Sequence, residues 1–308
     1  MIARPISTAR SIALMPKVAQ ASDALVGEWR AAGQHAPNLA YDLRLLSLDA
    51  LWRSLFLDQN DNGAANTELA RAAAQFASAE SHKLTTELAI LAPLADIALA
   101  RRNQLRFGSA GIGAPLDRNT MILFLHAGHD NVAAVMRWAL WLVAGRPALQ
   151  DRILAEHRDA RDAPDAPMPV TEAVILETLR LYPPIPQMAR EVEVDLEADG
   201  RVLKAGFTAI ISIYALHRSR LYWERPDEFE PERFLDDEGQ ARRNVLLPFG
   251  SGPRGCIGAS LARLELKLFL SQIVGAFSLA RDDDAPLHFS TDWVIRPLTR
   301  APIFVTPR

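Results

Sequence analysis

A glycine-rich segment near the carboxyl end, Phe249 to Gly258, reads FGSGPRGCIG and contains Cys256, the only cysteine of the chain. Apolar residues follow at helical spacing, which predicts a long amphipathic helix from Ile257 to about Phe277. The stripe that this helix would bury consists of Ile257, Leu261, Leu264 and Leu268. The segment therefore requires a fold in which a tight turn presents one thiol at the start of a buried helix.

The chemistry of this turn favours a cysteine that binds a metal. A helix N-terminus lowers the pKa of a thiol and supplies free N–H donors, so the sulfur can stay ionised as a metal ligand does. Arg254 is placed to pair with an acidic group on a bound ligand. The alternatives are an inert buried cysteine and a hydrolase nucleophile, for which no His/Asp pair can be assigned. The glycines that leave room for a flat macrocycle to approach the backbone are Gly250, Gly252, Gly255 and Gly258.

The first half of the chain has an almost wholly helical pattern, from Ser7 to about Ala144. Leu84 to Ala100 is predicted to be a core helix. Gly108 to Pro115 breaks the pattern, and an apolar helix is predicted from about Asn119 to Val143. Pro147 suits the first position of the next helix. With 308 residues, 49% of them hydrophobic, the chain has enough apolar material for one sizeable core.

Later in the chain the pattern becomes that of strands. Between Glu191 and Tyr214 the apolar period changes from 3.6 to 2, and Asp199-Gly200 is typical of a turn, so a hairpin is predicted. Residues 294–295 and 303–305 are expected to form a closing strand pair. The predicted fold class is mainly α with small β-sheets (α+β). One domain is expected over residues 1–308: mostly helical over 1–182, hairpin and meander over 183–240, then the cysteine loop, the last long helix and the closing strands over 241–308.

Composition argues against several classes of function. A net charge of −3 offers no basic surface for nucleic acid. A single cysteine excludes an internal disulfide, zinc spacing is absent, and a cytoplasmic location is expected. No stretch approaches the roughly 20 apolar residues of a membrane span. The residues before Asp23 include Arg4, Arg10 and Lys17 but no acid, as in a targeting peptide, although a helical stripe through Val18 is the preferred interpretation.

The segment from Phe249 to Gly258 resembles the haem-binding signature of the cytochrome P-450 family, in which Phe, Gly, Arg, Cys and Gly stand at these spacings. The resemblance is to a soluble, bacterial-type member. It implies the cytochrome P-450 fold, haem b as cofactor, and Cys256 as the axial thiolate ligand of the haem iron. The loop residues that it places at the haem are Phe249, Gly250, Arg254 and Gly258, with Arg254 on a propionate.

A buried ion cluster is also implied by the resemblance. Glu177 and Arg180 stand three residues apart on one face of a short helix. The family locks this Glu-x-x-Arg pair against the arginine of a later Pro-Glu-Arg-Phe sequence, here Arg233. Such a cluster costs several kcal/mol of desolvation unless every donor is satisfied, so its implied role is structural, in holding the cysteine loop. Without the resemblance, the pair would be a solvated salt bridge.

The segment from Tyr182 to Arg190, YPPIPQMAR, is a crossing made rigid by prolines. In the family this crossing lines the substrate pocket, and an arginine at the place of Arg190 binds a haem propionate, which suits a guanidinium group. The alternative for Arg190 is an ordinary charge at a strand edge. The residues expected to line a largely apolar substrate pocket are Phe124, Ile185, Gln187 and Met188.

The long apolar helix contains a polar patch, AGHDN, at residues 127–131. Buried polar groups are costly, so the patch implies a cavity, a ligand or ordered water. In the family this helix crosses the haem. Ala127, Gly128 and Asp130 match its pattern, whereas Asn131 replaces the usual threonine that assists proton delivery. The resemblance therefore places Ala127 at the haem and the other three residues at the oxygen site.

Asn131 leaves the reaction type open. Its amide can hydrogen-bond to oxygen or orient a water while Asp130 feeds a proton chain, the substrate can supply the missing hydroxyl, or the reaction is another oxidation such as a coupling. His126 and His129 suggest a second metal site, but a third ligand is lacking and this interpretation is disfavoured.

The match to the family begins late, as if the amino-terminal quarter were lacking. The stretch from Leu57 to Asn119 is also short for the family's helices F, G and H. We therefore expect either a fragment or a shortened form. The family pairs the hairpin from Val192 to Tyr214 with amino-terminal strands, so an unpaired edge is expected here.

These features favour a haem-thiolate oxidoreductase that monooxygenates a small apolar organic substrate with dioxygen. No flavin or nucleotide fingerprint occurs, so a separate ferredoxin-like or flavodoxin-like electron donor is expected. The alternative is a truncated or degenerate member that is non-catalytic or binds haem weakly, which the late start and Asn131 both favour. A basic rim near the cysteine loop either faces an acidic donor or is merely solvated; it consists of Arg242, Arg243, Arg263 and Lys267.

Overall fold

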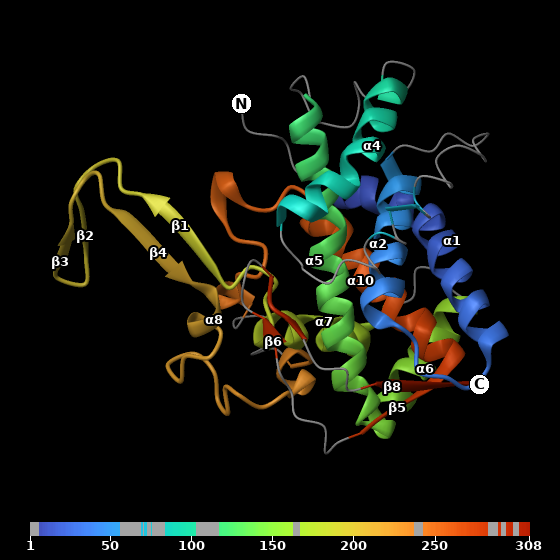
Figure 1. Cartoon of the computed structure of the whole chain (residues 1–308). Coiled ribbons are helices and arrows are strands. Elements are labelled where there is room, and N and C mark those ends of the chain that lie inside the picture. Colours follow the sequence, from blue (N-terminus) through green and yellow to red (C-terminus); the bar gives the residue numbers. More distant parts are fainter. Residues whose placement is uncertain are drawn as a thin grey trace.

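The structure is a computed structural model, and it describes residues 6–55, 69, 71–72, 75, 84–102, 117–162, 167–236, 243–282, 289–290, 294–297 and 302–308. The predicted break at Gly108–Pro115 and the basic residue Arg242 lie outside these residues. The helices (α), 3₁₀ turns (η) and strands (β), shown in Figure 1, are α1 (Thr8–Ala32), α2 (Leu39–Leu55), α4 (Leu84–Arg102), α5 (Arg118–Ala144), α6 (Pro147–Asp162), α7 (Pro169–Leu181), β1 (Gln187–Glu191), β2 (Leu196–Ala198), β3 (Arg201–Leu203), β4 (Thr208–Ser212), α8 (Ile213–Leu216), η2 (Pro231–Phe234), η3 (Arg243–Val245), η4 (Gly252–Arg254), α10 (Ala259–Ala276), β5 (Phe277–Arg281), β6 (Phe289–Ser290), β7 (Arg296–Pro297) and β8 (Ile303–Pro307).

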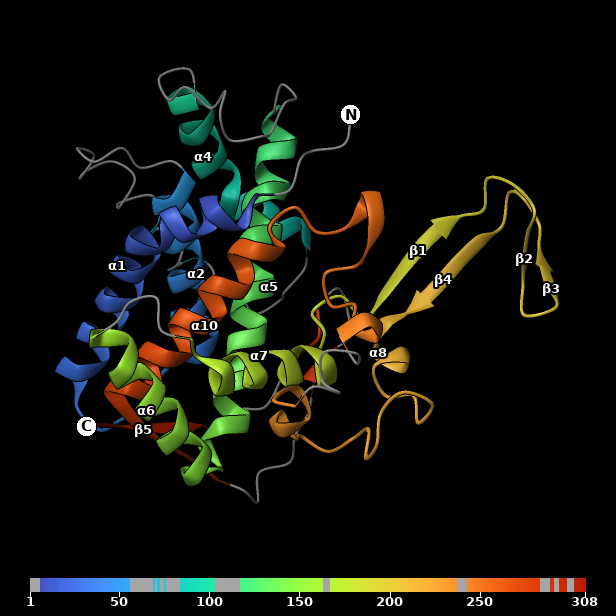
Figure 2. The ribbon, with the colours of Figure 1, turned by 180° about the vertical axis from the view of Figure 1, so that it is seen from behind.

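Helix α5 runs through the centre of the helical body. It begins after Asp117, whose carboxylate accepts a hydrogen bond from the Thr120 N–H at 2.7 Å, and it ends before Gly145. Its largely apolar surface must be covered by neighbours, and α2, α4 and α10 pack against it, as Figures 1 and 2 show from opposite sides. The predicted helix from Asn119 to Val143 is confirmed. Among the described residues no single helix is long and apolar enough to cross a membrane, although α5 and α6 pass such a test as a pair bent by 117°.

Two apolar clusters form most of the core. The larger joins α1, α5, α7, α10 and the strands β5 and β8, with Phe269 and Phe277 fully buried. The smaller joins α2, α4 and α5 around Leu91 and Leu94. Truncating a fully buried phenylalanine such as Phe269 to alanine typically costs about 3–5 kcal/mol. The prediction that Leu84 to Ala100 forms a core helix is confirmed.

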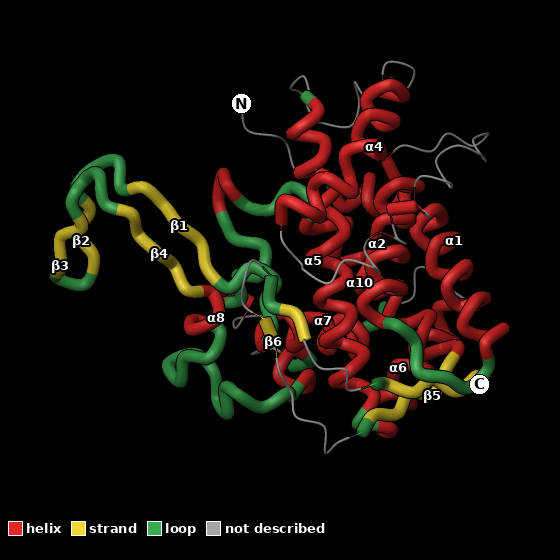
Figure 3. The backbone as a smooth tube through the Cα atoms, in the orientation of Figure 1, coloured by secondary structure: helices red, strands yellow, loops and turns green. Residues whose placement is uncertain are grey.

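The predicted hairpin forms a two-stranded arm that projects from the helical body (Figure 3). Strand β1 pairs antiparallel with β4, with Ala189 opposite Ile210, and β2 pairs with β3 at the tip. Asp199 and Gly200 connect β2 to β3 with φ values of 49° and 68°, as a type I′ turn requires. Ile210 is 67% exposed. The described residues contain no third strand for this sheet, so the sheet shows the unpaired edge that was expected.

The closing strands pair differently from the prediction. Strand β8 pairs with β5, with Phe277 opposite Pro307, whereas residues 294–295 precede β7, which pairs with β6. Strand β5 follows α10 without a break. Its side chains alternate between buried and exposed, as in a half-buried strand. The last helix ends at Ala276, and Phe277, which the prediction placed at the helix end, is the first residue of β5.

Candidate functional site

The cysteine loop is folded by tight glycine turns. Gly250 and Gly252 have φ values of 68° and 69°, in the left-handed region that other residues rarely adopt. The Cys256 N–H donates to the Phe249 carbonyl at 2.8 Å and closes the loop. A Cβ atom on Gly258 would meet no atom within 4 Å, so open space lies beside the backbone at this position. The glycines therefore allow the tight turns of the loop and also leave room for a ligand to approach its backbone.

The Cys256 thiol lies just before the last helix. α10 begins at Ala259, with Gly258 as its N-cap, so the predicted start at Ile257 was two residues early. Burial raises the pKa of the Cys256 thiol above its ordinary value, and the Gly258 N–H, which lowers it, only partly offsets this effect. The expected depressed pKa is therefore not found, because desolvation outweighs the helix terminus. A coordinating metal ion deprotonates a thiol in any case.

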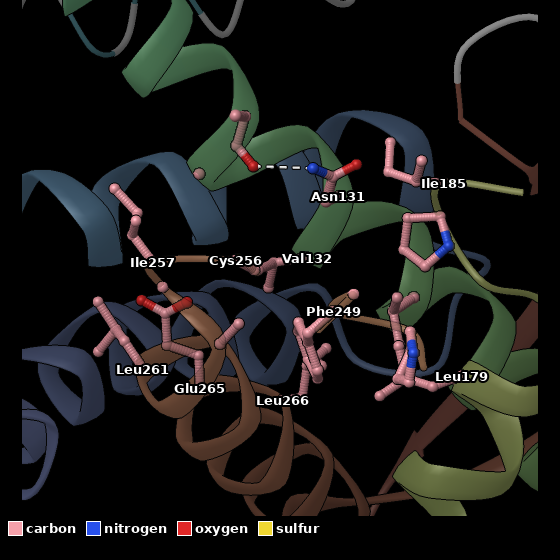
Figure 4. A pocket seen from close by; sticks show the side chains of 18 of the residues that line it. Asn131, Val132, Leu179, Ile185, Phe249, Cys256, Ile257, Leu261, Glu265 and Leu266 are labelled. Carbon is pink, nitrogen blue, oxygen red and sulfur yellow. Dashed lines mark hydrogen bonds between the residues drawn. The ribbon is translucent and has the colours of Figure 1, made fainter. Parts of the chain in front are cut away.

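A cavity of about 300 Å³ lies between the cysteine loop, α10, the start of β1 and α5 (Figure 4). Figure 4 shows α5 with Asn131 on one side, and α10 with Leu266 on the other. An apolar cavity with a few polar groups is typical of a site for a cofactor or a small molecule. Nearly all of its lining side chains are apolar, the exceptions being Asn131, Arg254, Cys256 and Glu265.

The α5 wall of the cavity includes Ala127, Gly128 and Asn131, three of the four α5 residues that the resemblance placed at the haem or the oxygen site. A Cβ atom on Gly128 would lie 2.7 Å from Leu51 Cδ2, so this glycine allows α2 to approach α5 closely. Asn131 donates its Nδ2–H to the Ala127 carbonyl at 3.0 Å. Its Oδ1 atom is buried without a hydrogen-bond partner.

Asp130, in contrast, does not line the cavity. It belongs to a buried ion cluster that joins α2, α4, α5 and β7. Arg44 Nη2 lies 3.1 Å from Asp130 Oδ1, and Arg296 Nη2 lies 2.7 Å from Asp130 Oδ2. Both arginines also contact Glu87, at 2.9 and 3.3 Å. Because guanidinium groups contact both of its oxygens, Asp130 is placed to clamp these elements together, and it does not reach the cavity wall where the resemblance implied it.

His126 and His129 lie beside this ion cluster. Burial lowers the pKa of His129 to about 4, so the ring is neutral at pH 7. The potential ligand atoms of Glu87, His126 and Asp130 all lie within 4.8 Å of one another. However, the two arginines of the cluster already pair with both carboxylates, and their charges repel a cation. The site therefore contains two carboxylates that could bind a metal ion, but the two arginines already neutralise their charges.

The predicted Arg–Glu–Arg cluster forms, and its buried donors are satisfied. Arg180 donates to both oxygens of Glu177, at 2.7 and 2.8 Å, and Arg233 Nε donates to the same carboxylate at 3.0 Å. The side chains of Glu177 and Arg180 are fully buried. All five N–H groups of the Arg180 guanidinium are thus used, since the remaining acceptors are the carbonyls of His217, Pro226 and Glu228.

His217 connects this cluster to the cysteine loop and was not predicted. Its Nε2 accepts a hydrogen bond from the Leu247 N–H at 2.8 Å, and its Nδ1 donates to the Arg180 carbonyl at 3.2 Å. This arrangement requires a neutral ring, and burial lowers the pKa of His217 to about 4. A lone histidine in the sequence ALHRS has no local pattern that would reveal such a contact.

Strand β1 divides the predicted pocket residues between its two faces. Met188 lines the cavity, and Arg190 shares its face but does not line the cavity. Gln187 lies on the other, exposed face and is not part of the lining either, because side chains alternate along a strand. Phe124 and Ile185, which were predicted to line a substrate pocket, line this cavity.

Glu265 is a cavity residue that sequence reasoning missed. Its carboxyl group is buried on α10, and Oε1 has no hydrogen-bond partner. Burial raises the pKa of Glu265 to about 8, so the group is largely neutral at pH 7. The sequence contains a signal for this residue, because a single acidic side chain beside Leu261 and Leu264 in the apolar part of the last helix indicates a buried carboxyl group.

A family model described as cytochrome P450 matches residues 115–303. The matched segment contains α5, the cluster around Glu177, the cysteine loop and α10. The chain belongs to the cytochrome P450 family. Its mainly helical fold with small sheets agrees with the predicted fold class.

Relatives and solved structures support this assignment. Cytochrome P450 4X1 of Rattus norvegicus is 39% identical over 189 residues, covering 58% of this chain and 37% of the rat protein. Cytochrome P450 4V2 of Homo sapiens is 41% identical over 170 residues, covering 52% of this chain and 32% of the human protein. The chain thus spans about a third of the length of these relatives.

Two solved P450 structures share the fold over almost the whole chain. A cytochrome P450 named CYP102L1 matches with a TM-score of 0.78 and 20% identity, over 98% of this chain and 76% of that chain. The heme domain of cytochrome P450DA matches with a TM-score of 0.77 and 25% identity, over 98% and 74%.

Haem b is the cofactor of the P450 family, and the residues around the cavity fit it. Cys256 offers a thiol on the loop side, and the open space beside Gly258 suits a flat ring. Arg254 lines the same cavity, and within the described part of the chain no carboxylate or carbonyl occupies its guanidinium group. These residues supply a soft ligand for iron and a cation for a propionate.

Proposed function

We propose that this P450 is a haem-thiolate oxidoreductase that monooxygenates a small apolar organic substrate with dioxygen. One observation carries the proposal: Cys256 lines an apolar cavity of about 300 Å³, and residues Gly128 and Asn131 of α5 line the same cavity. Haem bound there would supply the reduction of dioxygen, so that one oxygen atom enters the substrate and the other forms water, with two electrons and two protons consumed.

Each residue of the loop side has a separate task in this proposal. Cys256 binds the iron and loses its thiol proton on binding. Arg254 pairs with a propionate through its unoccupied donors. Arg190 lies on the Met188 face of β1 and is the candidate for a second propionate contact. The cluster around Glu177 acts indirectly, because His217 ties it to the residue before Pro248 and so positions the loop.

The substrate side of the cavity selects apolar molecules. Phe124, Val132, Ile185 and Met188 line it, and their side chains carry no N–H or O–H donor. Burying apolar ligand surface against them contributes roughly 25 cal/mol for each Å² removed from water. The same side chains exclude water from the reacting atoms.

A separate ferredoxin-like or flavodoxin-like protein would supply the electrons. Phe249 lines the cavity and also lines a second groove. This second groove includes Arg263 and Lys267. Arg263 is paired with Glu172 at 2.6 Å, so Lys267 is the better candidate to meet an acidic donor. A reducing compartment such as the cytoplasm would keep Cys256 available.

The test is the absorption spectrum of the haem-loaded protein after reduction and addition of carbon monoxide. A strongly red-shifted, thiolate-type Soret band is expected in the wild type. Cys256→Ser should abolish it without changing the helical content, because serine is nearly isosteric. Substrate-dependent oxygen consumption is then measured with apolar test compounds. Failure of the wild type to take up haem would contradict the proposal and favour a non-catalytic family member.

A further inference from the structure

The arm formed by β1 and β4 has two outer edges that no other described strand covers. Opposite views show the arm standing away from the helical body (Figures 1 and 2). On β4, the side chains of Ile210 and Ile211 are 67% and 41% exposed, so apolar side chains project from both faces of this strand. An edge strand presents a row of backbone groups that can pair with another strand.

The ladder shows which backbone groups of β4 face outward. The Val192 N–H donates to the Phe207 carbonyl at 2.8 Å, so these two opposite residues form a hydrogen-bonded pair. Hydrogen-bonded and non-hydrogen-bonded pairs alternate along an antiparallel ladder. Thr208 and Ile210 belong to the second kind of pair. Their N–H and C=O groups therefore point to the outer edge of β4, where the described part of the chain offers no partner strand.

The edge of β4 lacks the features by which proteins keep edge strands unpaired. Charged side chains and prolines are the usual ones. Strand β1 has both, because Arg190 and Glu191 lie within it and Pro186 precedes it. Strand β4 has neither, and the sequence between Lys204 and His217 contains no charged residue. The two edges of the arm are therefore unequal, and β4 is the one open to pairing.

We propose that β4 pairs antiparallel with β4 of a second copy of this chain, about a two-fold axis at Ile210. The axis places Ile210 opposite its own copy, so that the outward backbone groups of both chains bond to each other. It places Thr208 opposite Ser212 of the partner subunit. On the other face, Ala209 lies opposite Ile211 of the partner subunit. Paired β-branched side chains and paired hydroxyl side chains are favourable neighbours across strands, so the edge is complementary to itself.

Charge favours a second copy over a charged partner strand. A two-fold axis brings each residue near it close to its own copy, so a charged residue there would repel its counterpart. Strand β4 meets this condition because it is uncharged. A charged partner strand would instead lose hydration without gaining an opposite charge from β4. Because the edge of β1 is guarded, pairing stops at two chains. The contact is one short strand from each chain, so the dimer is weak and depends on concentration.

The test is analytical ultracentrifugation of the full chain from about 1 µM to about 1 mM, a range that covers weak contacts. The wild type is expected to pass reversibly from monomer to dimer. Ile210→Lys sets two ammonium groups opposite each other at the axis and should raise the dissociation constant at least about tenfold. The matched control is Val202→Lys, because Val202 is 53% exposed but lies on β3 at the tip of the arm. The control should stay within about twofold of the wild type.

Cysteine cross-linking tests the register independently. In the proposed dimer, Ala209 and Ile211 of the partner subunit form a non-hydrogen-bonded pair, with a Cα separation of about 4.5 Å that a disulfide can bridge. A mixture of Ala209→Cys and Ile211→Cys chains should therefore form interchain disulfides several-fold faster than either variant alone. The wild type under the same oxidation measures the background from Cys256, which is the only native cysteine.

Several results would overturn the inference. A protein that stays monomeric over the whole range would leave the edge of β4 to a strand of a different protein. A dimer that Ile210→Lys leaves intact, or that Val202→Lys weakens equally, would have its interface elsewhere. Equal cross-linking in the mixture and in the separate variants would reject the two-fold register. None of these measurements uses haem, so each result is independent of the proposed function.

Discussion

The cluster around Glu177 and the wall of the cavity are both buried and both contain polar side chains, but they satisfy those groups differently. Arg180 places all five of its N–H groups on acceptors within the chain. In the cavity, Asn131 Oδ1 and Glu265 Oε1 have no partner. Buried polar atoms in proteins are normally hydrogen-bonded. The Arg180 guanidinium is thus fully satisfied within the chain, whereas the cavity wall keeps two oxygen atoms without a partner.

Helix α5 carries both kinds of group in consecutive residues. Asp130 lies in the ion cluster with Arg44 and Arg296, whereas Asn131 lines the cavity. Consecutive helix residues differ by about 100° around the axis, so one turn can serve the scaffold on one face and a ligand on the other. The predictions below test this separation.

The largest effect is expected from Glu177→Gln. The substitution leaves Arg180 buried without a carboxylate and leaves Arg233 with Glu230 alone, so the free energy of unfolding should fall by about 3–5 kcal/mol. Chemical denaturation followed by circular dichroism measures this loss. The matched control is Glu172→Gln, which removes the partner of the exposed Arg263 and should cost less than about 1 kcal/mol. Equal losses of unfolding free energy in the two variants would contradict the prediction that the Glu177 cluster stabilises the fold more than an exposed ion pair does.

Acid should destabilise the scaffold through His217. Burial lowers its pKa to about 4 in the folded protein, below its ordinary value of 6.5. Above pH 6.5 both states hold a neutral ring, and the stabilisation is complete. As pH falls toward 4, the unfolded state binds a proton that the folded state does not, so up to about 3 kcal/mol is lost.

Denaturation at pH 7 and pH 4 in the wild type and in His217→Gln measures this contribution. The variant should lose about 3 kcal/mol less than the wild type over this interval. His129, whose pKa is also lowered to about 4 by burial, acts equally in both proteins and cancels. Parallel pH profiles would mean that His217 is solvated in the folded state.

Asp130→Asn should give a smaller loss, about 2–3 kcal/mol, because Glu87 remains to pair with Arg44 and Arg296. Denaturation curves measure the stability, and oxygen consumption measures the reaction. A variant with unchanged stability but without oxygen consumption would contradict the scaffold role and support the role at the oxygen site that the resemblance implied for Asp130.

The smallest effect is expected from Arg254→Leu. The side chain is exposed at the cavity and has no partner among the described residues, so the free energy of unfolding should change little. Haem affinity should fall about tenfold, or roughly 1.4 kcal/mol, through loss of a propionate contact. A haem titration measures the affinity, and Lys204→Leu on the distant hairpin is the control. Equal affinities in the two variants would exclude Arg254 from cofactor binding.

Local patterns in the sequence were sufficient for the features that depend on neighbouring residues. The glycine loop around Cys256, the helix of Glu177 and Arg180, and the hairpin turn at Asp199-Gly200 all form as predicted. Each rests on a conformational preference that acts within a few residues.

The features that were missed depend on contacts between distant parts of the chain. Arg44 and Arg296 reach Asp130 across 86 and 166 residues, and no local pattern announces such partners. The pairing of β5 with β8 and the outward face of Gln187 likewise depend on register and tertiary packing. The sequence predicted a lowered thiol pKa for Cys256, whereas partial desolvation of this thiol, which residue spacing does not reveal, raises it.

The most direct test of the central claim is the electron paramagnetic resonance spectrum of the ferric, haem-loaded protein, compared with that of Cys256→His at equal haem content. The wild type is predicted to give a thiolate-type low-spin signal, and the variant an imidazole-type signal. A wild-type spectrum that lacks thiolate character, or one that the substitution leaves unchanged, would contradict the assignment of Cys256 as the iron ligand.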